Sequence, residues 1–288
     1  MKQGVQASLL SDGRRLHLHN GPIDLIIEAF GAKNEILASY RQGKEAFEGL
    51  LEKLVDDLPL LRSPITKVEA EPQSAIANYM ISVVKPHRMY FVTPMAAVAG
   101  SVADTILKAM VDGPKISRAY VNNGGDIALY LTPGEKLRTG MVTDLKKINV
   151  NGLAEIPFES PVRGIATSGW SGRSLSLGIA DSVTVLARSA AAADVAATLI
   201  ANAVDVDHAS VIRTPAREMD LDSDLGDHLV TVRVGTLEEE YIDLALQSGI
   251  GVAGNMRQKG LIEAASLTLQ GHTQFVGHTV AALNRDVA

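Results

Sequence analysis

The sequence Val121-Asn122-Asn123-Gly124-Gly125-Asp126-Ile127 joins two short segments, Arg118–Val121 and Asp126–Leu131, that have the composition of β-strands. Glycine and asparagine accept the positive φ angles of tight turns, so the pattern predicts a strand–turn–strand unit. Paired glycines also let a ligand approach the backbone closely, and exposed N–H groups at such a turn can bind a phosphate or a polar ring edge. The alternative is an ordinary turn in which an asparagine side chain caps its own loop.

Segments on both sides of this unit predict further strands and helices. The expected strands are Val5–Leu10, Arg14–His19, Pro22–Ile27, Arg163–Thr167, Ser182–Ala187, Leu229–Val234 and Ile262–Gln270. The expected helices are Glu45–Leu61, Gln73–Val84, Ala97–Met110, Ala190–Val204 and Glu238–Ala253, with a polar, acidic segment at Asp205–Asp227. Because strands and helices cluster instead of alternating, we expect an α+β fold with largely antiparallel sheets and packed helices. No repeat or low-complexity linker divides residues 1–288, so we expect one domain and leave a two-lobed arrangement open.

The composition narrows the function classes. The 288 residues include 27 Lys and Arg against 33 Asp and Glu, a formal net charge of −6, which argues against broad binding of nucleic acid or membrane surfaces. The absence of cysteine excludes disulfides, zinc–thiolate sites and a thiol nucleophile. The first ten residues lack a signal-peptide pattern and no uncharged apolar run reaches the ~18 residues of a membrane span, so we expect a cytoplasmic protein.

Small polar residues end one predicted strand at Ala166-Thr167-Ser168-Gly169. Two hydroxyls and a glycine at a strand end form a polar lip that can face a ligand, and the alternative is an ordinary turn. A serine nucleophile needs a base and an orienting third group, and no G-x-S-x-G pattern surrounds Ser168. We therefore reject a serine hydrolase.

A lone carboxylate interrupts the otherwise uncharged helix Ala190–Val204. Asp194 and Thr198 are four residues apart, so they share a helix face. A carboxylate on an apolar helix is costly to bury unless it is paired or bound to metal, and carboxylate plus hydroxyl oxygens suit Mg²⁺. The alternative is an aspartate favoured by the helix dipole, with Thr198 bonded to its own backbone.

Two further features allow both a structural and a functional interpretation. In the helix Ala97–Met110, Gly100 costs about 1 kcal/mol relative to alanine, which indicates close packing or close approach of a ligand. The acidic residues Asp220, Asp222, Asp224 and Asp227 form either a solvated loop or a second metal site. An EF-hand starting at Asp220 would need glycine and glutamate where Leu225 and Thr231 stand.

Taken in order, these motifs resemble the ApbE superfamily, whose founding members are FAD:protein FMN transferases. The first motif is a helix of small residues that contains Gly and Asp. It is followed by Asn-x-Gly-Gly-Asp-Ile, then Ala-Thr-Ser-Gly, then Ser-Val-Thr-Val and finally Ala-Asp-x-x-Ala-Thr. Together these motifs extend over about a third of the chain. The sequences Val98–Gly100 and Ser223–Asp227 resemble more closely the uncharacterised ApbE-like proteins of that superfamily.

The resemblance implies an α+β fold with a flavin nucleotide, FAD or FMN, in a cleft and Mg²⁺ at its phosphates. The positions that match the flavin-binding motifs are Gly100, Asp104, Asn123, Gly124, Gly125, Asp126, Thr167, Ser168 and Gly169. Asp194 and Thr198 match the acid and the hydroxyl that hold magnesium. The implied partner is a small nucleotide, with an acceptor protein if FMN is transferred.

The sequence departs from the transferases at two places. The position of the family's lysine is Ala99, and the segment His-x-x-Asp-Pro-x-Thr-Gly is missing from Trp170–Asp181, which has no histidine. In that gap Asp181 is the candidate base. We therefore expect a protein that binds a flavin nucleotide with Mg²⁺, and we leave open whether it also acts on the FAD pyrophosphate by FMN transfer or hydrolysis. The alternatives are a non-catalytic flavin- or nucleotide-binding module, and an enzyme on the same scaffold that uses another small ligand.

Overall fold

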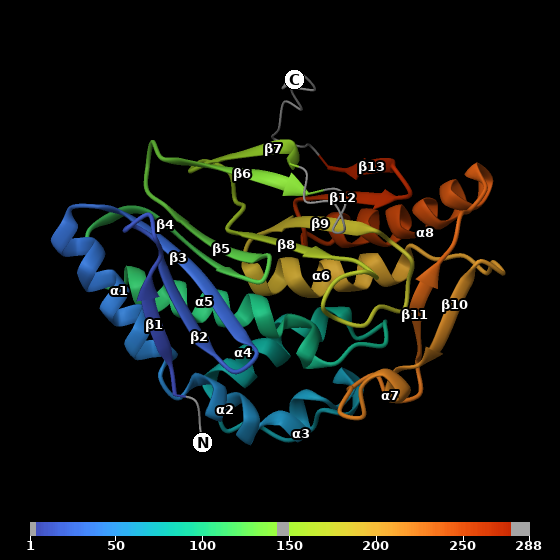
Figure 1. Cartoon of the computed structure of the whole chain (residues 1–288), viewed down its shortest axis with the longest axis horizontal. Helices are drawn as coiled ribbons and strands as arrows, with labels where there is room; N and C mark the ends of the chain where they lie inside the picture. The colour runs from blue at the N-terminus through green and yellow to red at the C-terminus, as the bar shows by residue number, and fades with distance from the viewer. Residues whose placement is uncertain (1–3, 143–149, 278–288) are drawn as a thin grey trace. The chain divides into compact units, whose positions relative to one another are not determined.

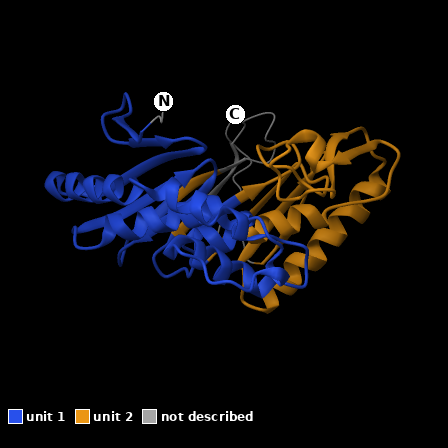
Figure 2. Cartoon of the chain, turned by 90° about the horizontal axis from the view of Figure 1, so that it is seen from below, with its two compact units in different colours: residues 1–137, 157–166, 188–194 blue, residues 138–156, 167–187, 195–288 orange. Residues whose placement is uncertain are grey.

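A computed structural model describes residues 4–142 and 150–277 and divides the chain into two compact units (Figure 2). Unit 1 comprises Met1–Leu137, Pro157–Ala166 and Arg188–Asp194, and unit 2 comprises Arg138–Ile156, Thr167–Ala187 and Val195–Ala288. The chain passes from one unit to the other within strand β8 (Gly164–Ser168) and again within helix α6 (Ala190–Ala203). Each unit is described by itself.

Unit 1 is built on antiparallel strands in the order β1-β2-β3-β4-β5-β8. Its strands are β1 (Gln6–Leu9), β2 (Leu16–Asn20), β3 (Ile23–Gly31), β4 (Ile116–Asn123) and β5 (Asp126–Leu131) (Figure 1). Its helices are α1 (Lys33–Phe47), α2 (Leu50–Asp56), α3 (Leu58–Leu61), α4 (Ala75–Val84) and α5 (Val98–Val111), with 3₁₀ turns at Ile65–Lys67, Lys85–His87 and Pro94–Ala97.

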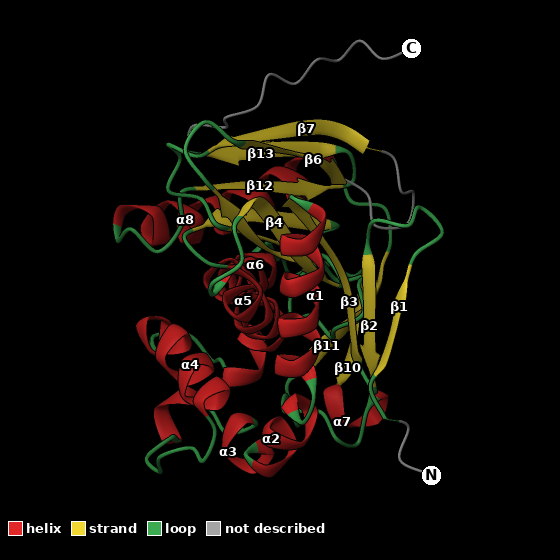
Figure 3. Ribbon diagram, turned by 90° about the vertical axis from the view of Figure 1, so that its left-hand side faces the viewer, coloured by secondary structure: helices red, strands yellow, loops and turns green. Residues whose placement is uncertain are grey.

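One face of these strands is covered by α1 and α5 (Figure 3). Alternate residues of β3, among them Leu25 and Ile27, are fully buried, as the two-residue period of a strand requires. From α5, Ile106 and Met110 fill the space beneath the sheet. Gly43 of α1 permits close helix packing, because a Cβ atom there would lie 2.9 Å from the Cγ atom of Met110. The core of unit 1 therefore lies between the sheet and this helix pair.

The apolar character of α5 raises the question of a membrane span. Among the described helices, Pro94–Val111 is long and apolar enough by composition, with a mean hydropathy of 1.3, and half of it is buried inside the protein. Asp104 and Lys108 interrupt the stretch, which is why no uncharged run was found in the sequence. The buried side of α5 packs in the core described above.

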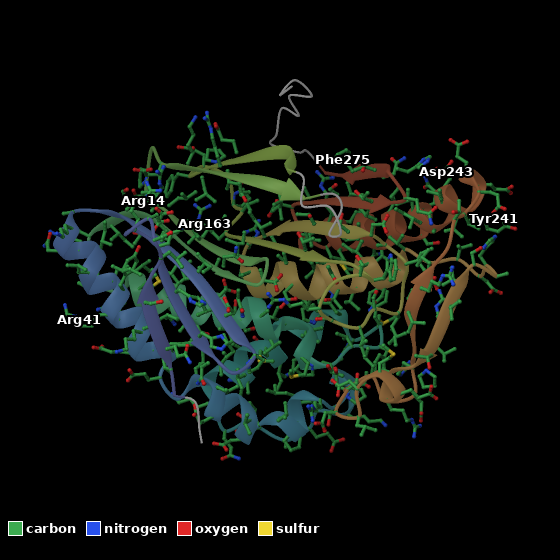
Figure 4. All side chains as sticks on the ribbon, in the orientation of Figure 1. Arg14, Arg41, Arg163, Tyr241, Asp243 and Phe275 are labelled. Carbon is green, nitrogen blue, oxygen red and sulfur yellow. The ribbon has the colours of Figure 1, made fainter. Side chains whose placement is uncertain are left out.

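The arginine that precedes β8 holds a turn of unit 1 together. The Arg163 guanidinium donates to the carbonyls of Ser160 at 2.7 Å and of Phe158 at 2.8 Å (Figure 4). These bonds satisfy carbonyl groups that belong to no strand or helix, as partly buried backbone requires. The segment that leads into β8 is thereby fixed.

Unit 2 contains a second antiparallel group of strands, β9 (Ser182–Ala187), β12 (Ala264–Leu269) and β13 (His272–Val276). Helix α8 (Glu239–Gln258) packs on β12 and β13. Two separate ribbons complete the fold: β10 (Val211–Pro215) with β11 (Leu229–Val234), joined through α7 (Ala216–Met219), and β6 (Lys136–Val142) with β7 (Val150–Pro157). Every residue of β9 is buried, so this strand lies in the core of the unit.

The predicted class is confirmed, since every strand pair whose register is given is antiparallel and helices pack beside the sheets. The predicted helix Glu45–Leu61 was wrong in outline. It is the end of α1 followed by α2 and α3, because Gly49 adopts a left-handed φ of 74° and Asp57 interrupts the next turn. The acidic segment Asp205–Asp227 also holds β10 and α7, which were not expected.

Candidate functional site

The N-terminal ends of α5 and α6 meet in unit 1, and each helix supplies a carboxylate to the end of the other. Asp194 of α6 accepts a hydrogen bond from the Gly100 N–H at 2.9 Å. Asp104 of α5 accepts from the N–H groups of Ala190, at 3.0 Å, and Ala191, at 2.9 Å. The first N–H groups of a helix lack partners within the helix, and the helix dipole makes that end positive. We call this arrangement of Asp104, Asp194 and the N–H groups that they bind the reciprocal cap.

Two glycines allow the helix ends to approach. A Cβ atom on Gly100 would lie 2.4 Å from the carbonyl oxygen of Ala190. A Cβ atom on Gly164 would lie 2.0 Å from the carbonyl oxygen of Ser189. Real Cβ atoms do not approach backbone so closely, so both positions require glycine. The close packing that the sequence allowed for Gly100 is therefore present, between α5 and the start of α6.

Burial sets the electrostatics of the two carboxylates. It raises the pKa of Asp194 to about 7, against the hydrogen bonds from the backbone of Gly100 and Ala99, and the charge of Asp104 adds to the rise. Burial also raises the pKa of Asp104, against the N–H groups of Ala191 and Ala190 and the Tyr79 hydroxyl. Two carboxyl groups thus share one partly buried region, where burial favours their neutral forms and the N–H groups of the helix ends favour their charged forms.

The β4–β5 turn adjoins this region through Asn123. The side-chain amide of Asn123 donates to the Ala99 carbonyl at 3.1 Å. Asn123 and Asp126 face each other across a two-residue turn, Gly124–Gly125, in which both glycines have positive φ, 66° and 118°. The Asn122 side chain accepts from the Gly125 N–H at 2.8 Å. The predicted strand–turn–strand unit is therefore present, and it carries the asparagine cap of the structural alternative.

The space beside the turn is open. A Cβ atom on Gly125 would meet no atom within 4 Å. Unit 1 therefore brings together a group of predicted site residues around the Ala99–Gly100 backbone, which we call the unit 1 cluster: Gly100, Asp104, Asn123, Gly124, Gly125, Asp126 and Asp194.

The remaining predicted site residues lie in unit 2. The hydroxyls of Thr167 and Thr184 are 2.9 Å apart, and Ser168 is the last residue of β8. Gly169 follows, and a Cβ atom there would lie 2.4 Å from the Asp181 carbonyl oxygen, so the turn after β8 packs tightly on the residue before β9.

Both carboxylate oxygens of Asp181 accept hydrogen bonds. The Trp170 indole N–H donates at 3.1 Å and the Gln270 backbone N–H at 2.6 Å. The carboxylate therefore ties the turn after β8 to the end of β12. Its role as a base stays a prediction.

The oxygen atoms that could hold magnesium come from Asp194 and Thr198 of α6. Asp194 offers one carboxylate that already accepts backbone N–H groups, and Thr198 lies one turn further along α6. Within residues 4–142 and 150–277, no three His, Asp or Glu side chains are grouped so that they could hold a metal. Mg²⁺ commonly keeps several waters and uses one or two carboxylates together with substrate phosphates. The residues fit a cation that arrives with ligand oxygens, and they do not form a complete protein cage.

The acidic segment of unit 2 is held by its own hydrogen bonds. Asp220 accepts from the Asp222 N–H at 2.9 Å, and Arg217 pairs with Asp227. Among the described residues of this segment, no three His, Asp or Glu side chains are grouped so that they could hold a metal. The solvated loop is the interpretation that these contacts favour.

A cavity of about 480 Å³ lies elsewhere in unit 1, at the start of α4. Its lining is Ala46, Leu50, Lys53, Asp56, Gln73, Ser74, Ala75, Ile76 and Thr105. None of the predicted site residues lines it, although Thr105 follows Asp104 directly.

Sequence reasoning also missed Tyr79, whose hydroxyl donates to Asp104 at 2.9 Å, because a tyrosine inside the predicted helix Gln73–Val84 carries no motif.

A model of the family described as AbpE bacteria matches residues 7–275. A UPF0280 protein of Methanothrix thermoacetophila is 40% identical over 120 residues, 41% of this chain and 49% of the relative. One of Methanopyrus kandleri is 35% identical over 175 residues, 59% of this chain and 66% of the relative. One of Methanoregula boonei is 30% identical over 196 residues, 66% of this chain and 79% of the relative.

The first two of these alignments cover about half to two thirds of the relatives' own length. Among solved structures, the apo form of the Pseudomonas stutzeri flavinyl transferase ApbE aligns with 94% of this chain and 93% of its own, at 12% identity and a TM-score of 0.43. A Vibrio cholerae flavin transferase ApbE aligns with 96% of this chain and 97% of its own, at 13% identity and a TM-score of 0.39.

Proposed function

The chain belongs to the family described as AbpE bacteria, an ApbE-like family, and we propose that it binds a flavin nucleotide, FAD or FMN, together with Mg²⁺ at the unit 1 cluster. The flavin follows from the resemblance of its ordered motifs to the ApbE superfamily. The cation follows from the charges and donors of the site itself.

One observation carries the proposal: two side chains bind the backbone of consecutive residues at the start of α5. Asn123 binds the Ala99 carbonyl and Asp194 binds the Gly100 N–H. Asn123, beside the glycine turn, and the α6 carboxylate are thus each within hydrogen-bond reach of the start of α5. The Gly124–Gly125 turn next to Asn123 provides backbone that a ligand can approach closely, and Asp194 provides a carboxylate that can hold a cation.

The charges at this point explain why a cation is needed. Helix N-termini usually attract phosphate, but here Asp104 and Asp194 already occupy the N–H groups. A pyrophosphate would therefore face two carboxylates and be repelled by them. A divalent cation between Asp194 and the phosphates removes that repulsion. We expect flavin affinity to depend strongly on Mg²⁺ for this reason.

Each residue of the site has a distinct proposed role. Asp194 would hold the cation, which neutralises phosphate charge when bound, and the role of Thr198 as a second ligand remains an expectation of the motif resemblance. The Gly124–Gly125 turn and Asp126 would contact the nucleotide through backbone and carboxylate. The motif resemblance also assigns nucleotide contacts to Thr167, Ser168 and Gly169 of unit 2, and these assignments remain predictions.

Chemistry on the bound nucleotide has two alternatives. FMN transfer to an acceptor protein or hydrolysis of FAD needs a base, and Asp181 is the candidate in the Trp170–Asp181 segment. A non-catalytic binding module is the second candidate function. The hydrogen bonds on both Asp181 oxygens favour that second candidate, because they give this carboxylate a structural role that needs no chemistry.

The test is a titration of the purified protein with FAD, once with Mg²⁺ and once with EDTA, followed by an assay for AMP. We expect binding with Mg²⁺ and little with EDTA. AMP release would support pyrophosphate chemistry, and loss of that release in Asp181→Ala would support its role as a base. Binding without AMP, in the presence and absence of added protein acceptors, would support the binding module. Failure to bind FAD or FMN would reject the proposal in favour of another small ligand.

A further inference from the structure

We propose that Asp104 is a positioning residue for Asp194: by holding the start of α6, it fixes where the Asp194 carboxylate lies. This inference rests on the proposed function, because it assigns to Asp104 an effect on cation binding. The motif resemblance placed Asp104 among the residues that contact the nucleotide. The hydrogen bonds around it lead to a different role.

The donors around Asp104 occupy its carboxylate. One oxygen accepts from the Ala190 N–H at 3.0 Å, and the other accepts from the Ala191 N–H at 2.9 Å and the Tyr79 hydroxyl at 2.9 Å. With three donors on two oxygens, the side chain is directed at the helix end and at Tyr79. A nucleotide contact would have to compete with all three.

The link from Asp104 to Asp194 runs through one turn of helix. Ala190 is the first residue of α6, and Asp194 lies four residues later on the same rigid element. The return link is the bond from Asp194 to the Gly100 N–H, four residues before Asp104 on α5. The two helix ends therefore form a closed loop of contacts in which each carboxylate fixes the helix that carries the other.

Backbone packing makes this loop rigid. The Ala190 carbonyl lies so close to Gly100 that no side-chain atom fits between them, and Gly164 of β8 has the same relation to Ser189. The residues just before α6 are thus enclosed by α5 and β8. A shift of the α6 end cannot be absorbed locally and would move Asp194.

The competing explanation is that Asp104 only stabilises the fold as a helix cap. Both explanations predict that loss of the carboxylate lowers stability, so stability alone does not separate them. The two explanations differ in the effect that they predict on cation affinity. A positioning residue changes cation affinity in protein that remains folded, and a cap that acts only on stability does not. Loss of the Asp104 charge also lowers cation affinity by itself, so the change must appear as well in Tyr79→Phe, which keeps that charge.

The experiment compares Asp104→Asn with the wild type in two measurements. The first is amide hydrogen exchange at Ala190 and Ala191, which reports whether the α6 end is held. The second is binding of Mn²⁺, used as a paramagnetic probe of the Mg²⁺ site, with and without FAD. We expect exchange at these amides to rise by about tenfold or more. We also expect Mn²⁺ affinity in the presence of FAD to fall by about tenfold, the lower end of the effect of removing a group that orients a metal ligand.

Two further variants complete the design. Asp112→Asn makes the same chemical change at the exposed C-terminal end of α5 and should leave both measurements at wild-type values. Tyr79→Phe removes one of the three donors and keeps the ring. It should give a smaller change in the same direction, and it tests the proposal if Asp104→Asn does not fold.

The outcomes are separable. Faster exchange with weaker Mn²⁺ binding supports the proposal. Faster exchange with unchanged Mn²⁺ binding overturns it and leaves Asp104 as a cap for stability. Unchanged exchange overturns the geometry on which it rests. Wild-type protein that binds neither Mn²⁺ nor FAD overturns the proposed function, and with it the positioning role.

Discussion

At the scale of single residues, Gly100 decides how near α5 lies to the start of α6. The nearest atoms to a Cβ there would all belong to backbone, at 2.4–2.6 Å, so no side chain can rotate away to make room. Glycine has a low helix propensity, but only glycine allows the short distance between Gly100 and the Ala190 backbone on which the reciprocal cap depends. A larger residue would separate Asp194 from the N–H that it binds.

The prediction for this residue is a loss of stability in Gly100→Ala. In a free helix the change would stabilise by 0.5–1 kcal/mol, but here we expect overpacking to lower the free energy of unfolding by about 1–3 kcal/mol. Urea denaturation measures the difference. The matched control is Gly251→Ala in α8, where a Cβ meets nothing within 4 Å and should be neutral or stabilising. Equal effects at both positions would contradict the close contact.

Asp57 provides a second residue-scale prediction, on pH. Its buried carboxylate accepts from the Gln73 N–H at 2.8 Å and from the Ser74 N–H at 2.9 Å and hydroxyl at 2.6 Å. Burial opposes ionisation, but these hydrogen bonds outweigh it and hold the pKa of Asp57 below its usual value of 3.8. The stabilisation is therefore present above pH 4 and is lost as pH falls through the lower pKa of the folded state.

We expect Asp57→Asn to lower the free energy of unfolding by about 1–3 kcal/mol at pH 7, since an amide N–H would face donors. The difference from the wild type should shrink as the pH is lowered from 4 towards 2. Denaturation at a series of pH values provides the measurement. The exposed neighbour Asp56 gives the control, Asp56→Asn. A loss that stays constant down to pH 2 would show that charge is not involved.

At the scale of elements, a substitution in the β4–β5 hairpin can distinguish the contribution of turn geometry to stability from the contribution of ligand contact to affinity. Gly125 has a φ of 118° and open space around a Cβ, so Gly125→Ala is strained in its backbone and free of clashes. We expect a loss of about 1–2 kcal/mol in the free energy of unfolding. If the turn contacts the nucleotide, FAD affinity measured in folded protein should also fall. Unchanged affinity in folded protein would remove Gly125 from the site.

Element by element, the sequence predicted best where periodicity and turn residues agreed. Asp126–Leu131, Ser182–Ala187 and Leu229–Val234 match strands to the residue. Helix α1 was missed because its buried face is short and includes Ser39 and Gly43. The break between α1 and α2 was missed because Gly49 was placed inside one helix, although a glycine with a left-handed φ directly after a helix is a local stop signal.

The candidate site could be predicted in part for a physical reason. A carboxylate on an apolar helix must have a partner, and the prediction that Asp194 has such a partner is confirmed. The partner is backbone N–H of α5, far away in sequence, and no local pattern indicates it. The same holds for Asp104, whose donors in α6 and α4 become neighbours only when the chain folds.

At the scale of the whole molecule, the order of weak motifs was more informative than any single motif. The Gly-Gly-Asp turn and the Thr-Ser-Gly strand end each have an ordinary structural explanation, and the structure shows the hydrogen bonds of the first. Their sequence along the chain indicated the ApbE superfamily, and a family model that matches residues 7–275 confirms it. The ligand is a separate matter, because the same fold can hold different small molecules.

The central claim is that Asp194 holds a cation through which a flavin nucleotide is bound. The most direct measurement is calorimetric titration of FAD into wild type and Asp194→Asn, each with Mg²⁺ and with EDTA. The asparagine keeps one oxygen for the Gly100 N–H and loses the charge that a cation requires. We predict that Mg²⁺ raises FAD affinity by tenfold or more in the wild type and leaves it unchanged in Asp194→Asn. The same Mg²⁺ dependence in both proteins, or none in the wild type, would contradict the claim.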